Sequence, residues 1–134
     1  MASIDSIECI EIKEATRLRK NGVRTTEALL KKAGTRRGRK DLATAAGLGD
    51  REVLDWVNRA DLMRVKGIGA EYSDLLEAAG VDTVKELKTR SPAALTKRMG
   101  TINSKKKLVR RLPTEAMVER WVSEAKKLKP AVRY

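Results

Sequence analysis

Histidine and phenylalanine are absent from the 134-residue sequence, and Cys9 is its single cysteine. Without histidine, the chain lacks the commonest general base and a frequent metal ligand. One cysteine cannot form an intrachain disulfide or a cysteine metal cluster, and its apolar neighbours are typical of a small core residue. No serine stands beside a recognisable activating group, and the carboxylates are scattered along the chain. We therefore expect no enzyme, no catalytic residues, no metal site and no cofactor.

Long apolar segments are missing as well. No stretch approaches the roughly 20 residues of a membrane-spanning helix. The first ten residues lack the charged and apolar regions of a signal peptide. We expect a soluble cytoplasmic protein without a membrane partner, and the sequence indicates no small-molecule substrate.

Aromatic residues make up only 3% of the chain, whereas hydrophobic residues make up 41%. The core of a chain of this length must therefore be built from Leu, Val, Ile and Ala. The most frequent residues are good helix formers, and no alternating run rich in β-branched residues is present. This composition predicts an all-α fold.

The clearest local pattern is the segment Val65–Val81, VKGIGAEYSDLLEAAGV. Gly67 and Gly69 bracket Ile68 in a tight turn, and apolar residues then recur at helical spacing up to Gly80, which ends the helix. We expect Ile68 to be buried and the glycine amides to point outward beside a helix N-terminus, where a DNA phosphate could bind. A tight interhelical turn without a ligand is the alternative interpretation.

The same pattern occurs earlier in the chain. Residues 7–30 lie over residues 65–87, where the matched positions have a constant shift of 58, and a later segment aligns at a shift of 65. The clearest matched pairs are Ile10/Ile68, Gly22/Gly80, Thr25/Thr83 and Trp56/Trp121. We infer two tandem helix-hairpin-helix-like modules, residues 1–60 and 61–134, related by internal duplication and packed as one compact body. We expect Ile10, Ile68 and both tryptophans to be buried.

The first copy of the turn is degenerate. Cys9 and Glu11 stand where the second copy has its two glycines, and Glu8 stands where the second copy has Lys66. An acidic turn without glycine is not expected to hold a phosphate, so the first hairpin is interpreted as structural.

Capping residues predict the limits of the helices. Expected N-caps are Thr25, Thr35, Asp50, Thr83, Ser91 and Thr114. Gly100 is expected to end the helix that begins at Pro92, and Pro113 to end a separate basic helix over residues 104–112. Residues 129–134 are expected to form a tail that lies on the surface or extends a contact.

The formal charge is +12, and most of the excess lies near the C-terminal end. Residues 1–60 carry a net +4, residues 61–95 a net −1 and residues 96–134 a net +9. Such a distribution favours salt-sensitive contact with a nucleic-acid backbone, although a charged helix face is most often simply solvated. The candidate nucleic-acid-binding residues are Lys66, Gly67, Gly69, Arg36, Arg37, Arg39, Lys40, Lys105, Lys106, Lys107, Arg110 and Arg111.

Three stretches of the chain resemble a bacterial domain-of-unknown-function family of tandem helix-hairpin-helix-like modules: DWVNRADLMRVKGIG, EYSDLLEAAGVDTVKEL and KKLVRRLPTEAMVERWV. Residues 63–87 are also similar to the helix-hairpin-helix motif of DNA repair and replication proteins. The resemblance covers nearly the whole chain and implies the fold. Members are often labelled flap-endonuclease-like 5′ DNA nucleases, but such a nuclease needs several carboxylates around divalent metals, and fold alone does not set activity.

Two functions remain open at this point. The first is a non-enzymatic, largely sequence-independent nucleic-acid-binding module that contacts phosphates through basic helices, and the alternative is a protein-protein interaction or scaffold module. Glu71, Asp74 and Glu77 line the helix after Gly69, which favours a structural role for that turn because carboxylates repel phosphate. Basic clusters on one face beside the turn would favour nucleic acid, whereas scattered clusters would favour a protein partner.

Overall fold

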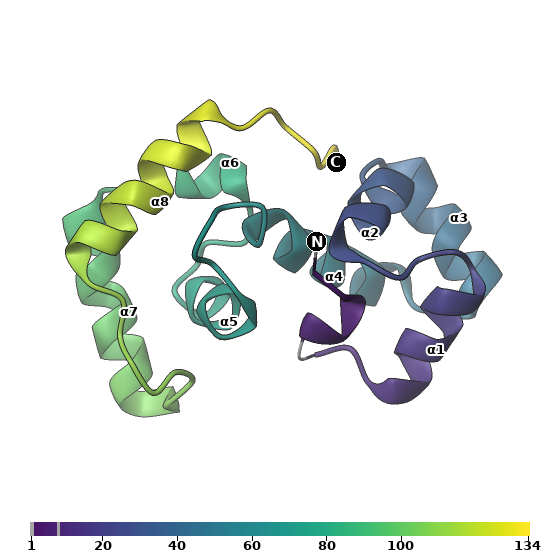
Figure 1. The fold of residues 1–134 in the computed structure, drawn as a ribbon, viewed down its shortest axis with the longest axis horizontal. Coiled ribbons are helices and arrows are strands. Elements are labelled where there is room, and N and C mark those ends of the chain that lie inside the picture. Colours follow the sequence, from purple (N-terminus) through teal and green to yellow (C-terminus); the bar gives the residue numbers. More distant parts are fainter. Residues whose placement is uncertain (1, 8) are drawn as a thin grey trace. The chain divides into compact units, whose positions relative to one another are not determined.

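A computed structural model describes residues 2–7 and 9–134 of the chain (Figure 1). Within these residues every regular element is helical, which confirms the all-α prediction. The elements are η1 (Ile4–Ser6), α1 (Ile12–Lys20), α2 (Thr26–Ala33), α3 (Arg36–Ala46), α4 (Asp50–Leu62), α5 (Ala70–Ala78), α6 (Val84–Leu87), α7 (Pro92–Lys106) and α8 (Glu115–Lys127). Glu8, which stands in the first copy of the turn where the second copy has Lys66, lies outside the described residues.

The chain divides into two compact units. The first unit comprises Met1–Asp61 together with Pro130–Tyr134, and the second comprises Leu62–Lys129. Residues 130–134, expected to form a surface tail, are therefore part of the first unit. There the backbone N–H of Arg133 donates to the carbonyl of Gly34 at 2.7 Å.

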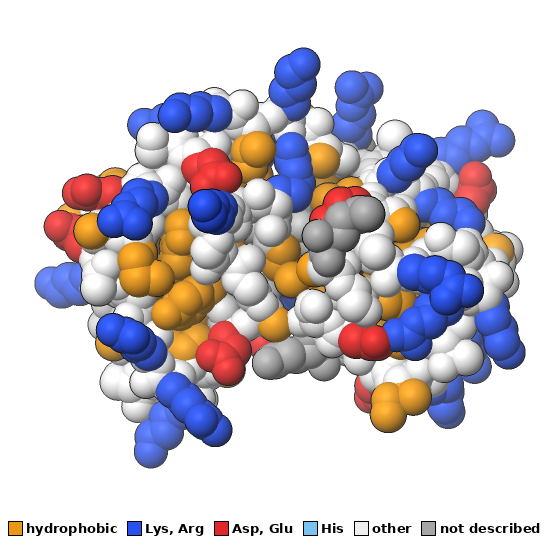
Figure 2. All heavy atoms as spheres, viewed as in Figure 1, with side chains coloured by type: hydrophobic (Ala, Val, Ile, Leu, Met, Phe, Trp, Pro, Cys, Tyr) orange, Lys and Arg blue, Asp and Glu red, His pale blue; other side chains and the backbone are white. Residues whose placement is uncertain are grey.

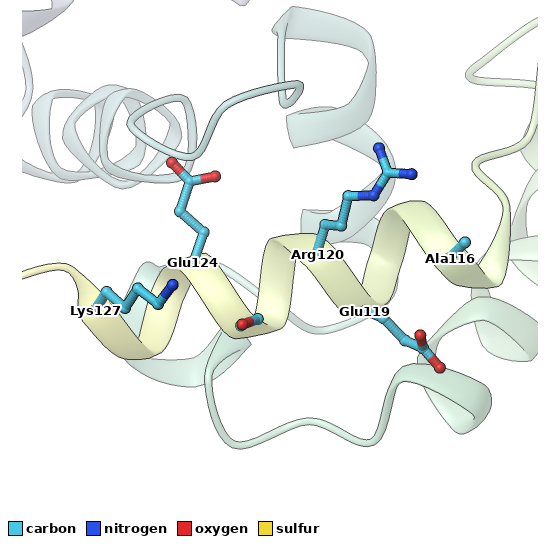
Figure 3. Close-up of a pocket in the computed structure, with 6 residues that line it drawn as sticks. Ala116, Glu119, Arg120, Glu124 and Lys127 are labelled. Carbon is cyan, nitrogen blue, oxygen red and sulfur yellow. The ribbon is translucent and has the colours of Figure 1, made fainter.

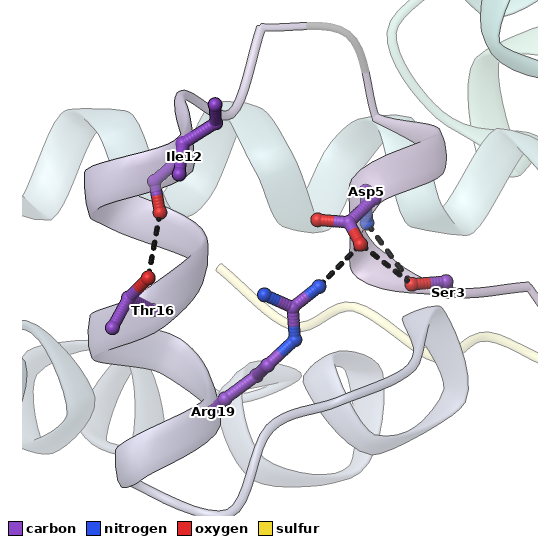
Figure 4. A network of polar contacts seen from close by, with 5 residues as sticks. All are labelled: Ser3, Asp5, Ile12, Thr16 and Arg19. Carbon is purple, nitrogen blue, oxygen red and sulfur yellow. Dashed lines mark hydrogen bonds and ion pairs between the residues drawn. The ribbon is translucent and has the colours of Figure 1, made fainter.

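In the first unit, α3 packs against α1 and α2, and α1 also contacts η1. The polar link between η1 and α1 is an ion pair between Asp5 and Arg19 (Figure 4). Two predicted N-caps are confirmed: the Thr25 hydroxyl accepts from the amide of Ala28 at 3.1 Å, and the Thr35 hydroxyl from that of Gly38 at 3.0 Å. Asp50 is the first residue of α4.

The core of the second unit is aliphatic and is completed by one tryptophan. Helix α7 packs against α5 and α8, and α6 packs against α8. The buried residues that form this core include Leu62, Ile68, Leu75, Leu76, Leu87, Met99, Val118 and Trp121. The hydroxyl of Thr83 accepts from the amide of Glu86 at 3.3 Å, and that of Thr114 from the amide of Met117 at 3.2 Å, so both predicted N-caps are confirmed.

One helix boundary in the second unit was predicted wrongly. Helix α7 begins at Pro92 as expected but continues through Gly100 to Lys106, and residues 107–114 are irregular, so the separate basic helix over residues 104–112 does not exist. Gly100 remains helical because Met99 and Leu95 on the same helix are buried, and this packing outweighs the helix-breaking tendency of glycine. The chain leaves the helix at Lys107, whose φ is +49°.

Matched positions in the two units have the same local geometry. Gly22 and Gly80 follow α1 and α5 with φ values of +81° and +91°. After each glycine, the next amide returns to the preceding helix: Val23 N–H donates to Leu18 at 2.9 Å and Val81 N–H to Leu76 at 2.8 Å. Ile10, Ile68 and both tryptophans are buried as predicted, with exposed fractions of 8% for Ile10, 4% for Ile68 and 2% for both Trp56 and Trp121. Cys9, expected to be a core residue, is exposed.

Candidate nucleic-acid interface

The turn that contains Gly67 and Gly69, called the GIG turn here, connects α4 to α5. Gly67 has a φ of +94°, in the region that favours glycine, and it is exposed. Gly69 is the N-cap of α5 and is extended, with φ −103° and ψ −162°. Only the first of the two glycines is therefore required by the backbone. Ile68 between them is buried in the core of the second unit, as predicted.

Trp121 packs against the GIG turn, and Tyr72 packs against Trp121. A Cβ atom at Gly67 would lie 3.1 Å from the indole nitrogen of Trp121, so the turn rests directly on this side chain. The rings of Trp121 and Tyr72 contact each other, with centroids 5.2 Å apart and planes inclined at 52°. Since Tyr72 lies in the first turn of α5, the two rings fix the start of that helix relative to α8.

Carboxylates already surround the GIG turn. The amide of Lys66 donates to Oε1 of Glu124 on α8 at 3.3 Å. Arg120 and Glu124 point to one side of α8, whereas Glu119 points to the other (Figure 3). Glu71 is exposed in the first turn of α5. Glu124 thus engages the amide of Lys66, and Glu71 competes with a phosphate for the N-terminal end of α5.

The basic segment of residues 105–111, called the basic loop here, begins with the last two residues of α7 and continues through the turn of the chain at Lys107. Its backbone is held by Asn103, whose side-chain amide donates to the carbonyl of Val109 at 3.1 Å and accepts from its N–H at 3.0 Å. The hydroxyl of Tyr72 donates to the carbonyl of Arg111 at 3.1 Å. The basic loop is therefore a fixed segment that lies beside the first turn of α5.

The charged side chains of the basic loop are all in solvent. The exposed residues are Lys105, Lys106, Lys107, Arg110 and Arg111. Leu108 and Leu112 are also accessible, with exposed fractions of 37% and 45%, whereas Val109 is buried. Lys and Arg side chains project from the visible surface of each unit (Figure 2). In the basic loop they are concentrated within seven residues that contain no carboxylate.

The Arg-rich cluster on α3 separates into exposed and buried residues. Arg36, Arg37 and Lys40 are exposed, and Arg37 lies 4.0 Å from Asp41 one turn later. Arg39 is only 6% exposed. Its guanidinium donates to backbone carbonyls, as described below, and burial lowers its pKa from the ordinary value, with Tyr134 opposing and Arg36 adding to that shift. An arginine nevertheless stays protonated at neutral pH. Arg39 is thus part of the internal packing of the first unit, contrary to its place among the candidate phosphate ligands.

Comparison with known proteins identifies a family. The model of the family described as Domain of unknown function (DUF4332) matches residues 8–128. The chain belongs to this family. No curated protein and no solved structure matches the chain. Because the DUF4332 description assigns no activity, the function must be argued from the residues themselves.

Two further properties of this DUF4332 chain concern the residues that the structure describes. Among them, no group of three or more His, Cys, Asp or Glu side chains is arranged to hold a metal ion. In the same part of the chain, no helix has both the length and the apolar character needed to cross a bilayer.

Sequence reasoning missed two residues that the fold adds to the α3 cluster. Arg51 on α4 and Tyr134 line the same pocket as Arg36 and Lys40. Arg51 stands between Asp50 and Glu52, where its charge is not conspicuous in the sequence. Tyr134 lies almost a hundred positions after the cluster, and no local pattern could have connected them.

Proposed function

We propose that the chain is a nucleic-acid-binding module without catalytic activity of its own, which contacts the phosphate backbone largely independently of base sequence. The observation that carries this proposal is the hydrogen bond from the Tyr72 hydroxyl to the Arg111 carbonyl. It brings the basic loop beside the helix that starts at the GIG turn. Two of the three groups of candidate residues are therefore neighbours within the second unit.

The chemistry of the basic loop suits a phosphate backbone. Duplex DNA carries one negative charge per roughly 1.7 Å of its axis, so several closely spaced cations can engage neighbouring phosphates at once. The two hydrogen bonds to Asn103 hold the loop backbone in place before binding. Less conformational entropy is then lost when the complex forms.

The GIG turn serves mainly as a support in this proposal. Its amide at Lys66 is engaged with Glu124, and Glu71 adds a second negative charge at the start of α5. The Lys66 side chain is exposed, so its removal tests whether a phosphate contacts the turn. The turn fixes the position of α5, and through Tyr72 it fixes the position of the basic loop.

We further propose that the two units are duplicated helix-hairpin-helix-like modules. The matched glycines after α1 and α5 and the matched amide bonds that follow them support this interpretation. A less obvious match concerns two basic residues that lie 58 positions apart, although their acceptors differ by one position: Lys32 donates to the carbonyl of Asn21, and Arg90 donates to that of Gly80 at 2.9 Å. In both units a basic side chain thus reaches the carbonyl groups at the end of the hairpin helix.

A protein-interaction or scaffold role is the second candidate. The observation that favours it is the exposure of Leu108, which lies among the cations of the basic loop, and of Leu112, which directly follows the loop. Aliphatic side chains contribute to binding when a protein partner removes them from water, whereas a phosphate backbone offers them little.

The first test of the proposal is a fluorescence anisotropy titration of labelled duplex DNA, single-stranded DNA and structured RNA at 50 and 200 mM salt. In the test variant, all five cations of the basic loop are replaced by Ala. The control variant removes five exposed cations elsewhere in the second unit by the substitutions Lys85→Ala, Lys88→Ala, Lys97→Ala, Lys126→Ala and Lys127→Ala. Both variants have the same net charge and differ mainly in the location of the cations removed, although the loop variant loses two arginines where the control loses only lysines.

We expect the affinity of the parent protein to fall steeply with salt, and the loop variant to bind more weakly with a salt slope lower by about four. The control variant should lose much less affinity. Equal losses in the two variants would contradict a localised site. Failure of the parent protein to bind any of the three nucleic acids would favour the scaffold role.

Two substitutions test whether the GIG turn only supports the fold or also contacts a phosphate. If the turn binds no phosphate, Lys66→Ala and Glu71→Gln should both leave the affinity unchanged within about twofold. Tighter binding by Glu71→Gln, together with weaker binding by Lys66→Ala, would show that a phosphate contacts the turn directly.

A further inference from the structure

A pocket of about 470 Å³ is present in the first unit. Its lining includes Arg36, Arg39 and Lys40 of α3, Asp50 and Arg51 of α4, and the ring of Tyr134. The volume falls within the range of roughly 300–1,000 Å³ that is usual for small-ligand sites. Four cations and one carboxylate among these residues give the pocket an excess of positive charge.

The exposed cations are brought together at some cost to the fold. Arg36 and Lys40 are one helical turn apart on the same face of α3, where like charges repel. Arg51 adds a third exposed cation from the next helix. An anion bound among the three would relieve this repulsion, and a phosphate group matches the fork of donors that each arginine offers.

Arg39 forms the rigid part of the lining. Its Nη1 donates to the carbonyls of Ala33 and Gly34 at 3.3 and 3.1 Å, and its Nη2 donates to the carbonyl of Arg133 at 2.8 Å. The side chain is 6% exposed, so these bonds are shielded from water. Arg39 therefore connects α3 to the C-terminal segment and fixes the pocket wall.

Tyr134 supplies a flat apolar surface next to the cations. The guanidinium carbon of Arg39 lies 5.7 Å from the centroid of its ring, and its hydroxyl donates to Oδ1 of Asn58 at 2.9 Å. These contacts orient the ring, yet Tyr134 is 61% exposed. The residue is therefore accessible from solvent although Arg39 lies over the ring, and an aromatic ring in this setting is a surface on which a nucleobase can stack.

We infer that this pocket binds a nucleotide, with the phosphate among Arg36, Lys40 and Arg51 and the base against Tyr134. Asp50, the carboxylate of the lining, is suited to accept a hydrogen bond from a ribose hydroxyl. The nucleotide is either a free mononucleotide or the phosphorylated terminal nucleotide of a strand, since both present the same phosphate and base. The site requires no residue of the basic loop, so it can exist whether or not the loop binds nucleic acid.

The test is isothermal titration calorimetry of the full chain with AMP, adenosine and inorganic phosphate at 50 mM salt. We expect AMP to bind at least tenfold more tightly than either fragment, because only AMP engages both the cations and the ring. Equal affinity for AMP and inorganic phosphate would overturn the nucleotide assignment, and so would equal affinity for AMP and adenosine.

Substitutions locate the two halves of the site. Lys40→Gln combined with Arg51→Gln should weaken AMP binding by about tenfold or more through loss of charge-assisted hydrogen bonds. Tyr134→Leu should weaken AMP binding but leave inorganic phosphate unaffected. The matched control is Arg37→Gln, on the same helix but paired with Asp41 outside this pocket, which should change the affinity less than twofold. A loss in the control as large as in the double variant would refute the assignment.

Two further measurements separate this site from the basic loop and identify the source of the nucleotide. The variant without the five cations of the basic loop should still bind AMP, and loss of AMP binding in it would overturn the placement of the site. Short oligonucleotides with and without a terminal phosphate then distinguish the sources. A preference for the phosphorylated strand that disappears with Lys40→Gln and Arg51→Gln supports a strand end, and AMP binding without such a preference supports a free nucleotide.

Discussion

At the scale of single residues, the two glycines of the GIG turn differ in what they require. Gly67 has a φ of +94° and a neighbour 3.1 Å from the position that a Cβ would take. Gly69 has an extended backbone and no atom within 4 Å of that position. A side chain at Gly69 therefore introduces no strain, although a G-x-G pattern by itself suggests that both glycines are needed.

We predict that Gly67→Ala lowers the free energy of unfolding by about 1–2 kcal/mol, because alanine disfavours a positive φ and its methyl group would press on Trp121. The matched control, Gly69→Ala, should lie within about 0.5 kcal/mol of the parent. Urea denaturation followed by circular dichroism measures both. If Gly69→Ala destabilised the protein as much as Gly67→Ala, the turn would have a different backbone from the one described.

Glu52 is a second residue with a testable consequence. The pKa of Glu52 is raised above its ordinary value, chiefly by a side-chain hydrogen bond with Glu14, then by desolvation and by repulsion from the Glu14 charge. The folded state therefore holds this proton more tightly than the unfolded chain does. The stability that comes from the protonated Glu52 side chain is present at acid pH and is lost as the pH rises through the folded-state pKa.

We predict that Glu52→Gln raises the thermal midpoint at pH 7, because the neutral amide retains a donor for Glu14 and removes the repulsion. The advantage should shrink as the pH falls through the raised folded-state pKa and should be lost by about pH 4.5, the ordinary pKa of the side chain, where the parent side chain is itself neutral. Differential scanning calorimetry at several pH values measures this, with Glu119→Gln on α8 as a control for the loss of one exposed charge. A gain that is the same at all pH values would contradict the proposed carboxyl pair.

At the scale of elements, the sequence predicted most of the helices because their caps are local. Thr25, Thr35 and Thr114 accept from amides three residues later, and such bonds depend only on neighbouring residues. The end of α7 could not be predicted in this way. Glycine permits a helix to end but does not force it to, and tertiary packing of α7 decided the outcome.

The candidate interface shows the same division between local and non-local information. The exposed cations of the basic loop were visible as a cluster in the sequence, but the separate helix predicted over residues 104–112 was wrong, since Lys105 and Lys106 end α7 and the following residues are irregular. The burial of Arg39 depends on a hydrogen bond to Arg133 across 94 positions. Its neighbours in the sequence are exposed cations, and nothing in the local pattern separates it from them.

The course of α7 gives a prediction at this scale. Gly100 lies inside the helix, and a Cβ atom there would meet no atom within 4 Å. We predict that Gly100→Ala stabilises the protein by about 0.5–1 kcal/mol, because alanine loses less backbone entropy than glycine when a helix forms. The urea midpoint should rise with little change in helical content. A destabilising effect would indicate that the helix bends or ends at this position.

At the scale of the whole molecule, the positive charge is unevenly divided between the two units. The first unit contains 14 basic and 10 acidic residues, a net +4, and the second contains 16 basic and 8 acidic residues, a net +8. Self-repulsion of this charge opposes the compact state, and isolated ion pairs on the surface offset little of it. A natural polyanionic partner would remove the same repulsion when it binds.

Salt should therefore have opposite effects on stability and on binding. We predict that raising sodium chloride from 50 to 500 mM increases the thermal midpoint of the protein alone. The reason is that a higher salt concentration shortens the distance over which its cations repel one another. Over the same range the affinity for nucleic acid should fall, because the release of counterions into a more concentrated salt solution gains less entropy. Removal of the five cations of the basic loop lowers the formal charge of +12 by five, so the thermal midpoint of this variant should increase less with salt than that of the parent protein. A midpoint of the parent protein that is constant or falls with salt would show that its excess charge is not a source of instability, and the repulsion argument would then be wrong.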